Sequence, residues 1–174
     1  MLAADAQAQV YEAAGHIFGC AYGQKHVYAL GPGFNPDSGS GEEAKVKALT
    51  GLIVAVERFK NSASNQLIVV SNLRTGRIIR KAHTGGPPHG GPCFICYGDA
   101  VTLVLKEDGS LAWLTEDGRY NIRTELHAVD KMGSRILASG QTDEGTEIDL
   151  QSLVLTGSTL HWTQGGKSFS ATLS

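Results

Sequence analysis

Short apolar stretches separated by glycine turns follow one another along most of the chain. The clearest series runs from Leu103 to Tyr120, where an apolar stretch, an Asp-Gly turn, a stretch carrying Trp113 and a second Asp-Gly turn succeed one another. Asp-Gly pairs readily supply the positive φ angles that tight hairpin turns require. The pattern therefore predicts short antiparallel strands joined by hairpins.

The same order of strand, turn and tryptophan-bearing strand returns near the C-terminus, where Trp162 takes the place of Trp113. A weaker copy in the first half of the chain has Val56 at the equivalent place. Because these positions recur once per unit, we expect Val56, Trp113 and Trp162 to be core residues of successive units, with a sugar-binding platform as the alternative for the two tryptophans. Repeats of roughly 40 to 50 residues with four strands each are typical of propeller blades.

The sequence thus predicts an all-β fold, a propeller-like array of about three to four small antiparallel blades. About thirteen strands are expected, too few for a regular closed ring of four blades, so the array is expected to be incomplete or open. A barrel or sandwich of similar strand number is the alternative. We expect residues 1–15, which are rich in alanine, to form a flexible segment and residues 16–174 a single β-repeat domain.

Charge and hydropathy exclude two classes of partner. The 15 Lys and Arg residues against 17 Asp and Glu residues leave a formal net charge of −2, which gives no net basic field to attract nucleic acid or an anionic membrane surface. The longest uninterrupted apolar run, Leu52 to Val56, is far below the roughly 20 residues of a membrane-spanning helix. We expect neither a nucleic-acid partner nor a membrane span.

Several segments resemble a group of uncharacterised exported proteins from actinobacteria and related soil bacteria, and the similarity covers nearly the whole chain. The segments that carry it are residues 6–13, 17–22, 72–77, 104–113 and 157–166. The resemblance implies an extracellular or cell-surface location, after removal of a signal peptide that is not present in this sequence. It also implies blade-like repeats, and it implies no particular activity.

The three cysteines are the main candidates for covalent chemistry. In an exported protein, a disulfide from Cys20 to Cys93 or Cys96 would close a ring of roughly seventy residues and contribute roughly 4 kcal/mol by the loop-entropy model. Free or mixed thiols and an intermolecular bond are alternatives, because three cysteines leave one over. A further alternative is a zinc site formed by His83, His89, Cys93 and Cys96, whose spacing suits tetrahedral coordination.

Other motifs point to no catalytic residue and no cofactor. Gly165–Ser168 imitates the end of a phosphate-binding loop, but His161 stands where the first glycine should be and a strand is expected to follow. The acidic segment 142–149 lacks the alternate spacing of a calcium loop and is expected to be a solvated linker. We expect His127, which falls in a predicted strand, to be a packed or surface residue.

Two functional classes remain. The first is an exported, non-catalytic module that binds a protein, a glycan or another copy of itself, and the incomplete strand count favours self-association. The second is a hydrolase or lyase whose site is built from several loops on one blade face. Convergent His, Asp and Arg side chains in one pocket would favour the enzyme, whereas an exposed apolar face or an unpaired strand edge would favour assembly.

Overall fold

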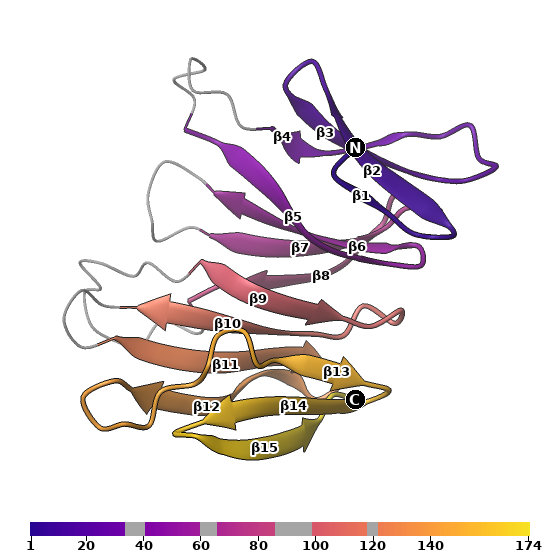
Figure 1. The fold of residues 1–174 in the computed structure, drawn as a ribbon. Helices are drawn as coiled ribbons and strands as arrows, with labels where there is room; N and C mark the ends of the chain where they lie inside the picture. The colour runs from indigo at the N-terminus through magenta and orange to yellow at the C-terminus, as the bar shows by residue number, and fades with distance from the viewer. Residues whose placement is uncertain (34–40, 60–65, 86–98, 118–121) are drawn as a thin grey trace. The chain divides into compact units, whose positions relative to one another are not determined.

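The computed structural model describes residues 1–33, 41–59, 66–85, 99–117 and 122–174. These residues contain fifteen strands and no helix. The strands form four separate antiparallel sheets in which strands adjacent in sequence pair with one another (Figure 1). Among the described strands, three sheets have four strands and one has three, and none of these sheets is closed. The predicted fold class, all-β with small antiparallel blades in an open, propeller-like fold, is confirmed.

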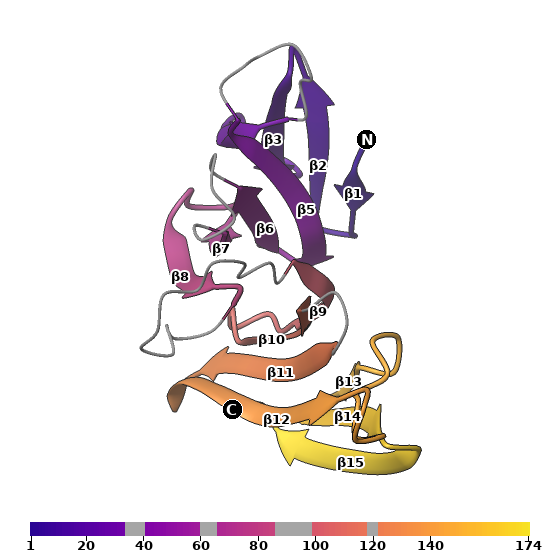
Figure 2. The same ribbon diagram turned by 90° about the vertical axis from the view of Figure 1, so that its left-hand side faces the viewer.

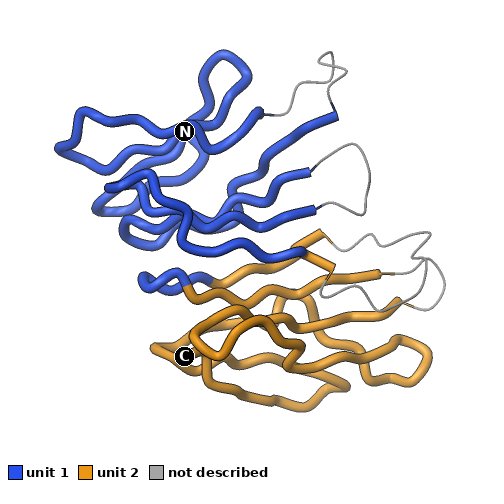
Figure 3. Tube along the Cα trace, turned by 180° about the vertical axis from the view of Figure 1, so that it is seen from behind, with its two compact units in different colours: residues 1–83, 105–109 blue, residues 84–104, 110–174 orange. Residues whose placement is uncertain are grey.

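The chain divides into two compact units (Figure 3). Unit 1 comprises residues 1–83 and 105–109, and unit 2 comprises residues 84–104 and 110–174. Each unit holds two of the sheets. The sequence predicts a single β-repeat domain over residues 16–174. The boundary between the two units falls inside strand β9 (Ala100–Leu105) and the turn that follows it.

The first sheet of unit 1 includes the N-terminal residues that were expected to be flexible. Its strands are β1 (Ala3–Ala4), β2 (Ala8–Ala13), β3 (His16–Ala21) and β4 (Tyr28–Pro32). Ala8 and Val10 are fully buried on β2, which pairs along its length with β3. Within residues 1–15, the segment predicted to be flexible, Ala3–Ala4 and Ala8–Ala13 are strands, because alternate small apolar residues give the segment one face that packs into a core.

The second sheet of unit 1 packs against the first. Its strands are β5 (Glu43–Thr50), β6 (Ile53–Phe59), β7 (Leu67–Asn72) and β8 (Ile78–His83). Val54 and Val56 of β6 share one core cluster with Val10 and Ile17 of the first sheet. The apolar middle of β7 is buried on both faces, as its lack of alternation predicts.

Unit 2 repeats this arrangement with one strand fewer. Its strands are β9 (Ala100–Leu105), β10 (Leu111–Asp117), β11 (Arg123–Asp130) and β12 (Gly133–Gln141) in one sheet, and β13 (Val154–Thr156), β14 (Thr159–Gln164) and β15 (Lys167–Thr172) in the other. Leu114 and Leu126 of the larger sheet form a core cluster with Leu160 and Trp162 of the smaller one.

The two tryptophans occupy equivalent places in their sheets, although their other contacts differ, since Trp113 donates to the Thr84 carbonyl at 2.9 Å and Trp162 belongs to the core cluster of unit 2. Each lies on the second strand of its sheet, is buried, and stacks on the ring of its direct partner on the third strand. The ring centroids of Trp113 and His127 are 5.1 Å apart, and those of Trp162 and Phe169 are 6.0 Å apart. Val56 is likewise buried on the second strand of its sheet. One structural unit, built around this position, is thus repeated along the chain.

Candidate functional site

The third strand of the last sheet is exposed, whereas two of the corresponding third strands, β7 and β11, are mostly buried. β7 and β11 have buried residues along most of their length, because a fourth strand pairs with each. β15 occupies the same place in its sheet, but its first four residues, Lys167 to Ser170, are all exposed. Within the described part of the chain β15 pairs with β14 alone, so it forms an open edge (Figure 1 and Figure 2).

The backbone pattern shows which groups face this open edge. The Leu173 N–H donates to the Ser158 carbonyl at 2.8 Å, across the end of the β14–β15 ladder. Antiparallel strands alternate between residues that bond to the neighbour and residues that face away from it. Because Leu173 bonds to the β14 side, every second residue before it, including Phe169, also directs its backbone N–H and C=O groups toward β14. Ser168 and Ser170 lie between these residues, so their N–H and C=O groups point outward, toward the open edge.

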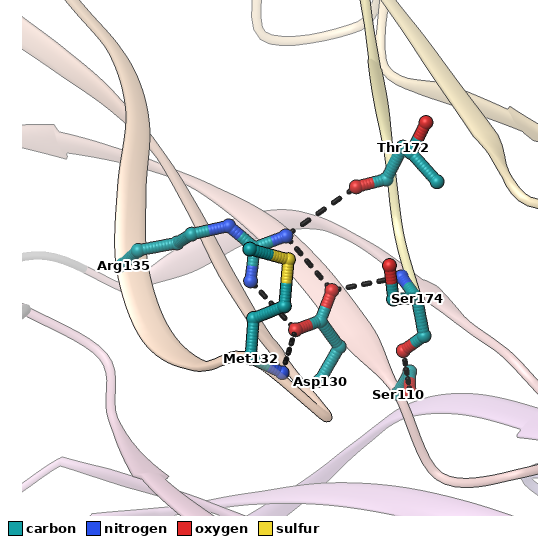
Figure 4. A network of polar contacts seen from close by, with 6 residues as sticks. All are labelled: Ser110, Asp130, Met132, Arg135, Thr172 and Ser174. Atoms are coloured by element: carbon teal, nitrogen blue, oxygen red, sulfur yellow. Dashed lines mark hydrogen bonds and ion pairs between the residues drawn. The ribbon is translucent and has the colours of Figure 1, made fainter.

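The C-terminal end of the same edge is closed by a polar network (Figure 4). The Arg135 guanidinium donates to the Thr172 carbonyl at 3.3 Å, and the Ser174 N–H donates to Asp130 Oδ2 at 2.8 Å. The Ser174 carbonyl in turn accepts a hydrogen bond of 2.9 Å from Ser110 Oγ. Side chains from the larger sheet and from the turn before β10 thus bond the Thr172 carbonyl and the N–H and C=O of Ser174, and the accessible part of the edge ends at Thr172.

Asp130 is the centre of this network. Its side chain is fully buried and accepts two hydrogen bonds from Arg135, at 2.6 and 2.8 Å, one from the Met132 N–H and one from the Ser174 N–H. The Arg135 hydrogen bonds hold the pKa of Asp130 well below its usual range, and the backbone donors act in the same direction, while burial opposes them. The same pairing raises the pKa of Arg135. The pair is therefore ionised at neutral pH and serves as a structural clamp.

The two faces of the last sheet differ in chemistry. Phe169 lies beside Trp162 on the face that packs into the core of unit 2, yet 44% of Phe169 is exposed because no described strand lies on its other side. The opposite face carries His161 and Ser170, which pair across β14 and β15, and is rich in hydroxyl groups. This polar face tolerates solvent, whereas the Phe169 ring at the edge leaves apolar surface uncovered.

A second group of polar side chains lies on one face of β10 and β11. His127 Nε2 is 3.2 Å from Thr115 Oγ1 and 3.2 Å from Glu125 Oε2, and Arg123 Nη2 is 2.6 Å from Glu125 Oε1. His127 and Thr115 are buried, and Trp113 covers the imidazole ring. An imidazole paired with a carboxylate can exchange a proton, so this row has the groups that acid–base chemistry requires.

Sequence reasoning found His127 but not the row to which it belongs. The signal that was available is alternation, since Thr115 follows Trp113 by two residues and His127 follows Glu125 by two. Alternate residues share a face of a strand. Only the register, which places Thr115 opposite Glu125, brings the two strands' residues together.

The predicted disulfide and the alternative zinc site both depend on residues that lie outside the described ranges. Cys20 is a half-buried free thiol on β3, and its sulfur accepts a hydrogen bond of 3.6 Å from the Gln9 amide. His89, Cys93 and Cys96 lie outside the described residues, and His83 ends β8. Among the residues that are described, no group of three or more His, Cys, Asp and Glu side chains is arranged to hold a metal ion.

The acidic segment 142–149 lies between β12 and β13, and its carboxylate-bearing residues, Asp143, Glu144, Glu147 and Asp149, are all exposed. One residue of the segment contributes to the core instead. Ile148 is buried and forms an isolated bridge with Gln164 at the end of β14. The segment therefore anchors the last sheet while its charged side chains face solvent.

Comparison with known proteins finds no protein-family model that matches the chain and no curated protein with significant similarity to it. In the ranges that the structure describes, no helix has the length and the apolar character that crossing a membrane would require.

Proposed function

We propose that this protein is an exported, non-catalytic β-repeat module that binds a protein, a glycan or another copy of itself through the open edge of β15. The observation that carries the proposal is the exposure of β15, a strand whose equivalents in the other sheets are interior. An edge of unpaired N–H and C=O groups is a template on which another strand can pair. The export part of the proposal is supported by the resemblance to exported proteins.

The outer strands β4, β8 and β12, which follow the third strand of their sheets, carry a feature that protects an edge, and β15 lacks it. The pairings of β3 with β4, β7 with β8 and β11 with β12 each contain a register shift. Such bulges twist an edge strand and discourage further pairing. The pairing of β14 with β15 is regular over its whole length, and Lys167 is the single charged residue of β15. β15 thus lacks the bulge that is found beside β4, β8 and β12, so its edge can pair with a further strand.

Binding at this edge is tested with defined probes. The probes are the protein itself at increasing concentration, purified peptidoglycan and cellulose as glycans, and a synthetic peptide of residues Gly133–Gln141, which form the fourth strand of the larger sheet of unit 2. We expect at least one probe to bind, and we expect Phe169→Lys to abolish that binding by placing a charge on the edge. The matched control is His161→Lys, which adds the same charge to an exposed position of the neighbouring strand.

Two results would contradict the proposed function. One is the absence of association with every probe. The other is binding that Phe169→Lys leaves unchanged, which would place the contact away from β15. Export is tested separately by comparing the amount of the full-length gene product in the culture medium and in the cell lysate of the source organism, where retention in the cells would refute it.

The alternative function, an enzyme of the hydrolase or lyase type, is supported by the Thr115, Glu125 and His127 row. In this proposal His127 would act as the proton-transferring group and Glu125 would orient it. Its test is a screen of glycoside and ester substrates with the unmodified protein and with Glu125→Gln. Turnover that is lost in the variant, while the fold is retained, would favour the enzyme over the binding module.

A further inference from the structure

We infer that the occupant of the open edge is β15 of a second copy of this chain, paired antiparallel about a two-fold axis that passes between the two Phe169 residues. The inference rests on the proposed function and names its partner. Two observations concern the backbone: Ser168 and Ser170 direct their N–H and C=O groups outward, and the Thr172 carbonyl is already bonded to Arg135. Two concern the side chains: the Phe169 ring is exposed, and Lys167 lies away from the centre of the edge.

The backbone groups fit this register. With Phe169 opposite Phe169 of the partner subunit, Ser168 lies opposite Ser170 of the partner subunit, and the reverse holds across the axis. Both serines direct their N–H and C=O groups outward, and each such antiparallel pair exchanges two hydrogen bonds, so the register forms about four. All the outward groups of the accessible edge are satisfied in this way.

The side chains fit as well. Phe169 and Phe169 of the partner subunit form a non-hydrogen-bonded pair, which is the class of antiparallel pair in which opposite side chains approach most closely. Both rings point to the core-side face of the joined sheet, so each covers the other's exposed surface, which amounts to 44% of the residue. Lys167 lies opposite Ala171 of the partner subunit, so the one charge of each strand is kept away from its counterpart.

Neighbouring registers are less favourable. A shift by two residues in one direction pairs Ser168 with Thr172 of the partner subunit, whose carbonyl already accepts a hydrogen bond from Arg135. A shift in the other direction pairs Ser170 with Gly166 of the partner subunit, which lies in the turn between β14 and β15 at a positive φ of 73°. The accessible edge is bounded at both ends, and the register centred on Phe169 is the one that fits between them.

This edge is self-complementary, and that favours a second copy over an unrelated strand. It presents equal numbers of donors and acceptors, an apolar ring at its centre and one charge off-centre, so a two-fold partner satisfies each feature. A single pair of short strands buries far less than the 1,200 to 2,000 Å² that is typical of stable interfaces. We therefore expect a weak dimer that forms as concentration rises.

The register is tested by cysteine cross-linking. In Phe169→Cys, the two new thiols face each other across the axis, at a Cα separation of about 4.5 Å that a disulfide can span. The matched control is Lys167→Cys, whose two copies are offset by four residues along the strands, roughly 13 Å. The unmodified protein, which carries the same three native cysteines, supplies the background.

We expect mild oxidation to convert Phe169→Cys to a covalent dimer on a non-reducing gel, with at least tenfold less dimer from Lys167→Cys. Similar yields from the two variants would overturn the register. Sedimentation velocity on the reduced unmodified protein checks the dimer without a cysteine, and we expect Phe169→Lys to remain monomeric while His161→Lys dimerises. Far-ultraviolet circular dichroism of each variant confirms that it is folded.

The outcomes separate this inference from the function on which it rests. If the unmodified protein stays monomeric at the highest attainable concentration while the Gly133–Gln141 peptide or a glycan still binds at β15, the second copy is the wrong partner and the binding function stands. If no probe associates with β15, both are wrong. A dimer that persists in Phe169→Lys overturns the inference directly.

Discussion

Replacing Asp130 with Asn tests whether the polar clamp holds the C-terminal residues in place. The substitution keeps the shape of the side chain but removes the charge that accepts hydrogen bonds from Arg135, Met132 and Ser174. Arg135 is the charge that would be left behind, and 24% of its side chain is exposed, so water solvates it in part. Leaving a hydrogen-bonded charged group without its partner costs about 1 to 3 kcal/mol, and since the Asn oxygen can still accept from one donor, we expect a loss of about 2 kcal/mol.

The assay is urea unfolding followed by far-ultraviolet circular dichroism, with Glu144→Gln as the control. Glu144 is exposed in the acidic segment before β13, and a charge removed from such a position changes stability by less than about 0.5 kcal/mol. If Asp130→Asn unfolds at the same urea concentration as the unmodified protein, the clamp contributes no stability and the account of the closed edge is wrong.

The same carboxylate predicts how stability depends on pH. Its pKa is lowered in the folded protein from an ordinary value of 3.8, so the unfolded chain takes up the proton first as pH falls. The contribution of Asp130 is fully present above about pH 5 and is lost progressively as pH falls through 3.8 toward the lowered pKa. We expect the difference in unfolding free energy between the unmodified protein and Asp130→Asn to shrink between pH 5 and pH 2. A constant difference over that range would show that the charge is not responsible.

Two further substitutions test the packing of unit 2, each by urea unfolding. Trp113→Phe removes the 2.9 Å hydrogen bond from the indole N–H to the buried Thr84 carbonyl. We expect the free energy of unfolding to fall by about 2 kcal/mol. An unchanged urea midpoint would show that this hydrogen bond does not stabilise the fold. Gly140→Ala places a Cβ 1.8 Å from the Thr146 carbonyl oxygen, and we expect the free energy of unfolding to fall by about 3 kcal/mol. The control is Gly85→Ala, which we expect to leave stability unchanged because no atom lies within 4 Å of the added carbon.

The sequence predicted the blades well because their turns and their core positions are local signals. Gly109 and Gly157 take positive φ angles in the hairpin before each tryptophan-bearing strand, and the Asp-Gly and Thr-Gly pairs mark those hairpins directly. The spacing from Trp113 to Trp162 then gives the repeat. Such features depend on neighbouring residues, so they can be read without knowing the tertiary structure.

The open edge and the polar row could not be predicted in the same way, because both depend on pairing between distant residues. Whether Phe169 lies inside or at the edge of a sheet depends on whether a fourth strand pairs with β15, and its own sequence does not reveal this. The contact of His127 with Thr115 requires the β10–β11 register. The strands of residues 1–15 are hard to predict for a different reason, since the small side chains of Ala8 and its neighbours resemble those of a frayed terminus.

The placement of the two tryptophans makes the chain its own fluorescent reporter. Both indoles belong to unit 2, and unit 1 has none. Tryptophan emission therefore follows the loss of structure in unit 2 alone, whereas the amide signal of circular dichroism follows both units. Superimposable curves from the two signals would mean that the units melt as one cooperative body, and separated curves would give each unit a stability of its own.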